Sequence, residues 1–161
     1  MKSNKLLLLL CSIGLLAAGC SSSKRAANAS ASPSLKEVFK KDFVIGAAVN
    51  TGQIEERDPA AGALIQAQFN GLTPENIMKC EIIHPEWDRY NFTLADKLVA
   101  YGNKINTPVF GHTLIWHSQL SPFVRRIQST DSFRTFFTNH ITTIAARYDG
   151  KVKGWDVVNE A

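Results

Sequence analysis

Cysteine is scarce in this sequence: Cys11, Cys20 and Cys80 are the only three among 161 residues. No spacing of cysteine and histidine suits a metal ion, so we expect no metal site. No glycine-rich phosphate motif follows a predicted strand, which disfavours a dinucleotide, and we expect no cofactor. The net charge of +4 is modest and no basic stripe gathers Lys and Arg, so we expect no nucleic-acid partner.

Long apolar runs are also missing, apart from residues 6–16. That run follows Lys2 and Lys5, is too short to span a bilayer, and is typical of an export signal. Three small residues, 17–19, lead from it to Cys20. This order resembles the lipobox of bacterial lipoproteins, in which the cysteine is acylated and becomes the mature N-terminus. We therefore predict a signal peptide over residues 1–19 and a lipid on Cys20.

The lipobox resemblance implies an exported protein that is held on the bacterial cell envelope by its lipid anchor alone. Ser21 follows the cysteine where some lipoproteins of the inner membrane carry Asp, so we expect the outer membrane. A secreted protein is the alternative. Residues 20–34, rich in Ser and Ala, predict a flexible tether, and residues 35–161 predict the folded domain. Cys80 then has no disulfide partner, and we expect it to be a small buried side chain.

Within residues 35–161, apolar strand patterns alternate with helical ones. Asp58 followed by Pro59 predicts a helix start, and Thr93 with Asp96 three residues later resembles a capping box. This alternation predicts parallel strands joined by right-handed crossovers, in either a doubly wound sheet or a barrel. The expected strands cover residues 43–49, 70–73, 108–116 and 155–158, and the expected helices cover residues 58–69, 93–105 and 131–148.

Polar side chains follow three of these predicted strands. Taken singly, each has an ordinary explanation, such as a surface cation for Lys79 or a core histidine for His112. The C-terminal ends of parallel strands open on one face, however, so we expect these side chains to converge there. They are Glu75, Asn76 and Lys79 after the second strand, His112, Trp116, His117 and Gln119 in or after the third, and Asn159 and Glu160 after the fourth.

This combination of side chains suits carbohydrate chemistry. A tryptophan can form a wall against a pyranose ring, and amide and cationic groups can bind sugar hydroxyls. A carboxylic acid can donate a proton to the glycosidic oxygen as the bond breaks. The residues include no Ser/His/Asp order that would indicate acyl transfer.

Three sequence blocks resemble the signatures of glycoside hydrolase family 10, a family that consists mainly of endo-β-1,4-xylanases on a TIM barrel. The blocks are Thr73–Lys79, Gly111–Gln119 and Trp155–Ala161, and Phe92–Asp96 resembles the family's segment between the first two. The resemblance runs from about Leu35 to Ala161. The sequence departs from the family at Cys80, Phe110 and Ser121-Pro122-Phe123, and the last of these departures affects contacts on the leaving-group side.

The resemblance assigns a role to each site residue. Glu160 is implied as the general acid/base of a retaining, double-displacement mechanism, and Asn159 as the partner of the sugar 2-hydroxyl. His117 is implied to support one of the two carboxylates. The remaining roles concern xylan binding, with His112, Trp116 and Gln119 around the sugar that is attacked and Glu75, Asn76 and Lys79 around the next sugar toward the non-reducing end.

A complete TIM barrel needs about 250 residues and eight strands, of which we expect this chain to supply the first four. The family's nucleophile follows the seventh strand, so we predict that the chain is the N-terminal half of a longer, monomeric enzyme and is inactive by itself. Two alternatives remain. One is a related enzyme that cleaves another β-1,4-glycan such as cellulose, and the other is a non-catalytic xylan-binding lipoprotein.

Overall fold

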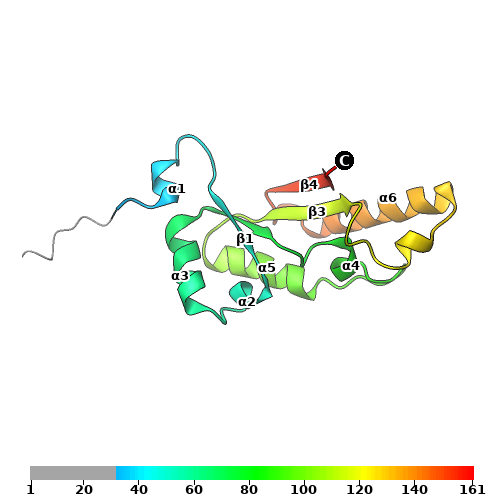
Figure 1. Cartoon of the computed structure of the whole chain (residues 1–161), viewed down its shortest axis with the longest axis horizontal. Helices are drawn as coiled ribbons and strands as arrows, with labels where there is room; N and C mark the ends of the chain where they lie inside the picture. The colour runs from blue at the N-terminus through cyan, green and yellow to red at the C-terminus, as the bar shows by residue number, and fades with distance from the viewer. Residues whose placement is uncertain (1–31) are drawn as a thin grey trace, which may run out of the picture. The chain divides into compact units, whose positions relative to one another are not determined.

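The computed structural model describes residues 32–161 (Figure 1). The predicted signal peptide, the predicted lipidation site Cys20 and most of the predicted tether lie outside these residues. The first helix begins at Leu35. Within the described residues, no helix is long and apolar enough to cross a membrane.

Four short strands run parallel to one another in the order of the chain. They are β1 (Gly46–Val49), β2 (Gly71–Pro74), β3 (Phe110–Trp116) and β4 (Gly154–Asn159). The strands β1 and β2 pair in parallel, as do β3 and β4, and a parallel bridge from Leu72 to Val109 joins the two pairs. A doubly wound sheet reverses its strand order at a switch point, whereas a barrel keeps the order of the chain. The arrangement is therefore that of a barrel.

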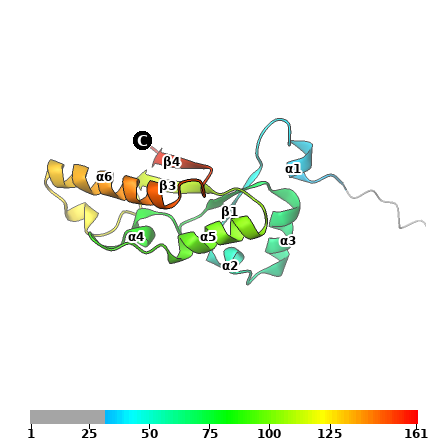
Figure 2. The same ribbon diagram turned by 180° about the vertical axis from the view of Figure 1, so that it is seen from behind.

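Helices connect successive strands. Figures 1 and 2 view the molecule from opposite sides, and α6 runs along β3 in both, in agreement with the contacts between the two elements. In chain order the helices are α1 (Leu35–Val38), α2 (Thr51–Ile54), α3 (Pro59–Gln68), α4 (Cys80–Ile83), α5 (Thr93–Lys104), the 3₁₀ turn η1 (Val124–Arg126) and α6 (Thr130–Arg147).

The core lies between the strands and the helices α3, α5 and α6. Leu72 of β2, Leu98 of α5 and Ile144 of α6 are fully buried in one cluster. The helical spacing of these apolar residues places one stripe of each helix against the sheet. Cys80 is buried as expected, in a smaller cluster with Phe136.

The start of the first strand is predicted wrongly, and several apolar residues of the predicted elements are exposed. The first strand begins at Gly46 rather than residue 43, and Phe43 is 56% exposed. Leu64 and Phe133 are apolar residues of the predicted helices 58–69 and 131–148, yet they are exposed on α3 and α6, and Val158 of β4 is half exposed. Val158 is exposed because, within residues 32–161, β4 pairs with a neighbouring strand on one side only.

The predicted helix starts have different outcomes. The side chain of Asp58 accepts a hydrogen bond from the Ala61 backbone N–H at the start of α3, as expected. The capping box at Thr93 is wrong. Thr93 is the first residue of α5, Phe92 is its N-cap, and the amide N–H of Thr93 donates to the side chain of Asn91. Asp96 instead accepts hydrogen bonds from Arg147 and Tyr148 on the α6 side.

Candidate active site

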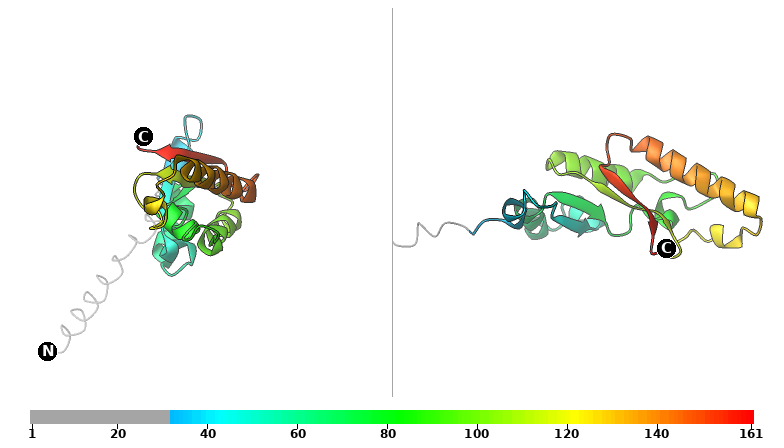
Figure 3. Two further views of the ribbon diagram at one scale, coloured as in Figure 1. Left: turned by 90° about the vertical axis from the view of Figure 1, so that its right-hand side faces the viewer. Right: turned by 90° about the horizontal axis from the view of Figure 1, so that it is seen from above.

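The C-terminal ends of β3 and β4 lie side by side, because the two strands pair up to Trp116 and Asn159, and Glu160 follows β4 directly. Figure 3 shows the end of the chain, marked C, just beyond the last strand. Trp116, the last residue of β3, donates its indole N–H to the Oε2 atom of Glu160 over 2.9 Å. Glu160 has a backbone φ of 51°, in the left-handed region that a non-glycine residue seldom adopts. The predicted aromatic wall and the predicted acid are therefore direct neighbours.

Lys79 is the centre of a polar cluster next to Trp116. The residue is 9% exposed, and its ammonium group donates to Oδ1 of Asn76 at 3.0 Å and to Oε1 of Gln119 at 2.6 Å. It also lies 4.6 Å from the centre of the Trp116 ring, within range of a cation–π interaction. Two amide oxygens and an aromatic face thus surround a cation that forms no ion pair within the described residues.

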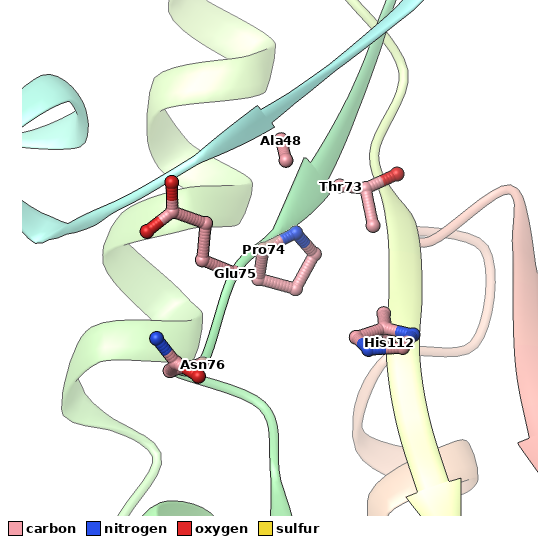
Figure 4. Close-up of a pocket in the computed structure, with 6 residues that line it drawn as sticks. All are labelled: Ala48, Thr73, Pro74, Glu75, Asn76 and His112. Carbon is pink, nitrogen blue, oxygen red and sulfur yellow. The ribbon is translucent and has the colours of Figure 1, made fainter. Parts of the chain in front are cut away.

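A second group of predicted residues lines an open hollow of about 390 Å³ at the end of β2 (Figure 4). His112 reaches this hollow from β3, and its Nδ1 lies 3.0 Å from a carboxylate oxygen of Asp156 on β4. Asn76 belongs both to this hollow and to the Lys79 cluster, so it connects the two. The lining residues are Ala48, Thr73, Pro74, Glu75, Asn76 and His112.

Asn159 and His117 line a hollow that the residues of the Lys79 cluster do not line. With Trp116 and Glu160 they line a hollow of about 350 Å³ whose remaining wall is apolar, formed by side chains such as Leu120 and Phe133. His117 packs its ring edgewise on Trp116, with 5.7 Å between the ring centres. Glu160 is the only carboxylate among the described residues that line this hollow.

The nine predicted residues therefore form a continuous rim rather than one cavity. Asn76, Lys79, Gln119, Trp116 and Glu160 are linked by direct contacts, while the others line the hollows on either side of them.

Sequence reasoning missed two residues of this rim, Asp156 and Glu81. Asp156 lies within the third signature block and is the one charged residue in the predicted strand 155–158, which could have singled it out as a residue of the site. Glu81 follows Cys80 in the short helix α4, and its carboxylate accepts a hydrogen bond from Nε2 of Gln119 at 2.9 Å. The two residues are 38 positions apart in the chain, so no local pattern joins them.

The described residues hold no group of three or more His, Cys, Asp or Glu side chains that could bind a metal ion. The chemistry available at the rim is that of several carboxylic acids, of which Glu160 alone lies against Trp116, together with a tryptophan face, histidines, amides and a cation.

Comparisons with a family profile, with related sequences and with solved structures all indicate one family of glycoside hydrolases. Residues 34–161 match the sequence profile described as "Glycosyl hydrolase family 10". The chain is 41% identical over 141 residues to endo-1,4-beta-xylanase A of Xylanibacter ruminicola, covering 84% of this chain and 38% of that protein. It is 44% identical over 129 residues to a beta-1,4-xylanase of Dictyoglomus thermophilum, covering 80% of this chain and 35% of that protein.

The fold agrees with solved structures of the same family. Xylanase 10B from Thermotoga petrophila, solved in complex with xylobiose, superposes with a TM-score of 0.74 at 41% identity, over 80% of this chain and 40% of that one. A psychrophilic family 10 endo-beta-1,4-xylanase gives the same TM-score at 35% identity. The chain thus spans well under half the length of the relatives it matches. These matches confirm the TIM-barrel fold class, with part of the barrel present here, and the chain belongs to glycosyl hydrolase family 10.

Proposed function

We propose that this chain is the N-terminal part of a retaining endo-β-1,4-xylanase that hydrolyses internal bonds of xylan. The observation that carries the proposal is the contact between Trp116 and Glu160 at the ends of two adjacent parallel strands. It places a carboxylic acid against the ring that would hold a sugar, as cleavage of a glycosidic bond requires. The names of the relatives support xylan as the substrate.

In the proposed mechanism, Glu160 first protonates the glycosidic oxygen as the bond breaks. A second carboxylate, about 5–5.5 Å away in retaining enzymes, attacks the anomeric carbon and forms a glycosyl-enzyme intermediate. Glu160 then acts as a base and removes a proton from the water that releases this intermediate. We propose that the second carboxylate comes from a later strand of the complete barrel, since the hollow around Glu160 holds no other among the described residues.

The other rim residues would bind the sugar. Asn159 would bond the 2-hydroxyl next to the scissile bond, and His112, Trp116 and Gln119 would surround the ring that is attacked. Glu75, Asn76 and Lys79 would bind the next sugar toward the non-reducing end. The ammonium group of Lys79 supports this role, because it is held between two amide oxygens, one of which belongs to Asn76 in the wall of the hollow.

The test uses the complete enzyme, meaning this chain together with the rest of its barrel. The variant Glu160→Ala should lose nearly all activity on xylan, because the leaving sugar then departs without a proton. It should keep more of its activity on an aryl xylobioside with a good leaving group, which needs little protonation. Glu37→Ala, which removes an exposed carboxylate whose one ion pair within residues 32–161 is with Lys40, is the matched control and should behave as the parent enzyme.

Three results would contradict the proposal. Equal losses on xylan and on the activated substrate would rule out an acid/base role for Glu160. Faster release of sugar from cellulose than from xylan would change the substrate, and xylan binding without any turnover would indicate a binding protein. We also expect residues 21–161 alone to release no sugar from xylan.

We further propose that the protein is exported and carries a lipid on Cys20, with the outer membrane as its location. The support is the order of basic, apolar and small residues before that cysteine. Labelling with a fatty-acid analogue in a bacterial host should mark the parent protein and leave Cys20→Ser unlabelled. Release of both proteins into the medium would favour the secreted alternative.

A further inference from the structure

We propose that Glu81 is a positioning residue that sets which atoms the Asn76 and Gln119 amides present to the sugar. This inference rests on the proposed function, since it concerns sugar binding at the same rim. Glu81 lies in α4, outside the residues expected to contact substrate, and its carboxylate is exposed at the edge of the Lys79 cluster.

Glu81 holds Gln119 at two points. Its backbone N–H donates to the carbonyl oxygen of Gln119 at 3.0 Å, and its carboxylate accepts from the side-chain Nε2 of Gln119 at 2.9 Å. Gln119 has a backbone φ of 45°, a left-handed conformation that costs energy for a residue with a side chain. Contacts to both its backbone and its side chain are what such a conformation needs in order to persist.

The charges on either side of Gln119 determine the direction of its amide. An ammonium group can only donate hydrogen bonds and an ionised carboxylate can only accept them. Oε1 therefore faces Lys79, and Nε2 faces Glu81. Turning the amide over would place an NH₂ group against the cation and an oxygen against the anion, so three favourable contacts would become unfavourable.

The orientation passes from Gln119 to Asn76. The second N–H of Gln119 donates to Oδ1 of Asn76 at 3.2 Å, and Lys79 donates to the same oxygen. Both donors fix this oxygen on the side of the cluster, so the NH₂ group of Asn76 is left for the hollow. Figure 4 shows the amide nitrogen of Asn76 on the side of Glu75. The hollow thus offers N–H donors to sugar hydroxyls, and the chain of contacts that orders them starts at Glu81.

The experiment measures KM and kcat of the complete enzyme on xylohexaose. The variant Glu81→Ala should raise KM about 3- to 10-fold, because it loosens the Asn76 amide at the next sugar as well as Gln119. It should lower kcat by a smaller factor, because only Gln119 lies at the ring that is attacked. Glu81→Gln, which keeps an acceptor but loses the charge, should fall between Glu81→Ala and the parent. Glu86→Gln is the control, since this exposed carboxylate pairs with Arg89.

A double-mutant cycle tests the route. In a Gln119→Ala background, Glu81→Ala should have almost no further effect on KM, because the residue through which it acts has gone. Additive effects of the two substitutions would overturn the proposal, as would a KM for Glu81→Ala equal to that of the parent. A parent enzyme that does not cleave xylan would instead contradict the proposed function.

Discussion

Trp116 and Glu160 are 44 residues apart in the chain, yet the indole N–H of one donates to the carboxylate of the other over 2.9 Å. The contact exists because β3 and β4 are parallel neighbours that end at the same edge, with Trp116 paired in register with Asn159. It occupies one carboxylate oxygen and leaves Oε1 without a hydrogen-bond donor among the described residues. The tryptophan is thus a candidate both for stacking on a sugar and for aiming the acid.

The variant Trp116→Phe separates these two roles, because phenylalanine keeps an aromatic face and removes the N–H donor. We expect kcat on xylan to fall about tenfold, the effect of losing one hydrogen bond to a charged group. KM should change less, since a ring still lies under the sugar. Steady-state kinetics of the complete enzyme measure both constants.

Trp87→Phe is the matched control for this prediction. Trp87 is 40% exposed, and its ring packs near Phe123 and Phe136, away from the Glu160 rim. The Trp87→Phe variant should retain the kcat of the parent enzyme. Equal kcat values for the two variants would show that the N–H of Trp116 does not assist Glu160.

Gly111 is needed for the packing of β3 against β4. It lies opposite Trp155 in the strand register, and a Cβ atom at this position would collide with the indole ring. We expect Gly111→Ala to lower the free energy of unfolding by about 1–3 kcal/mol through overpacking.

Gly62→Ala is the control, because nothing lies within 4 Å of an added Cβ there. That change should stabilise α3 by about 0.5–1 kcal/mol. Urea denaturation of the complete enzyme measures both, and a Gly111→Ala variant as stable as the parent would contradict the packing argument.

The positions of the site residues were predictable from the sequence because they depend on a simple rule. Residues that follow parallel strands share one edge, so Lys79, Gln119 and Glu160 could be placed near one another before any contact was known. The contacts themselves were not predictable. Glu81 bonds Gln119 only because the loop after β3 folds back over α4, and no pattern of spacing records that fold.

Local rules also failed where a tertiary contact competed with them. Asp96 has the spacing of a capping box after Thr93, but its carboxylate faces the guanidinium of Arg147 on α6. The hydrogen bond and charge of Arg147 lower the pKa of Asp96. An ion pair with a residue about 50 positions away thus replaces the expected bond within the helix. The exposure of Val157 and Val158 could not be predicted either, because an apolar sequence pattern does not say which neighbours cover those side chains.

A pair of variants at the start of α5 distinguishes the capping box expected at Thr93 from the hydrogen bond that Asn91 accepts in the structure. Asn91 accepts from the Thr93 backbone N–H at 3.2 Å, whereas the Thr93 side chain makes no capping bond. We expect Asn91→Ala to cost about 1 kcal/mol of unfolding free energy and Thr93→Ala less than about 0.5 kcal/mol. The midpoints of urea denaturation compare them directly. A larger cost for Thr93→Ala would restore the capping box that the sequence suggests.

A buried pair of histidines links α4 to α6 beneath the site. The Nδ1 atoms of His84 and His140 are 3.0 Å apart, His84 Nε2 faces the carbonyl of Trp87, and His140 Nε2 faces the carbonyl of Leu114. Both rings are almost completely removed from solvent. Burial lowers the pKa of His84, and burial together with the neighbouring ring lowers the pKa of His140 to about 4.

This pair should make the domain less stable in mild acid. In the unfolded chain a histidine has a pKa of about 6.5, so between pH 6.5 and 4 the unfolded state binds the proton that the folded His140 excludes. Stability is therefore full above pH 6.5 and declines as the pH falls toward 4. His140 alone accounts for a loss of about 3 kcal/mol over that range.

The variant His140→Gln isolates this contribution, because glutamine can still donate to the Leu114 carbonyl but does not titrate. Urea denaturation of the complete enzyme at pH 7, 6, 5 and 4 should show a smaller loss of unfolding free energy for the variant than for the parent. The carboxylates titrate in both proteins, so their contribution cancels in the comparison. The pair makes three contacts, one between the two Nδ1 atoms and one from each Nε2 to a carbonyl oxygen, and each contact needs one N–H donor. Two neutral imidazoles supply two N–H groups, so one more bound proton would provide the third donor. A parent protein that gains stability between pH 7 and 5 would show that the pair takes up that proton, and would contradict the prediction.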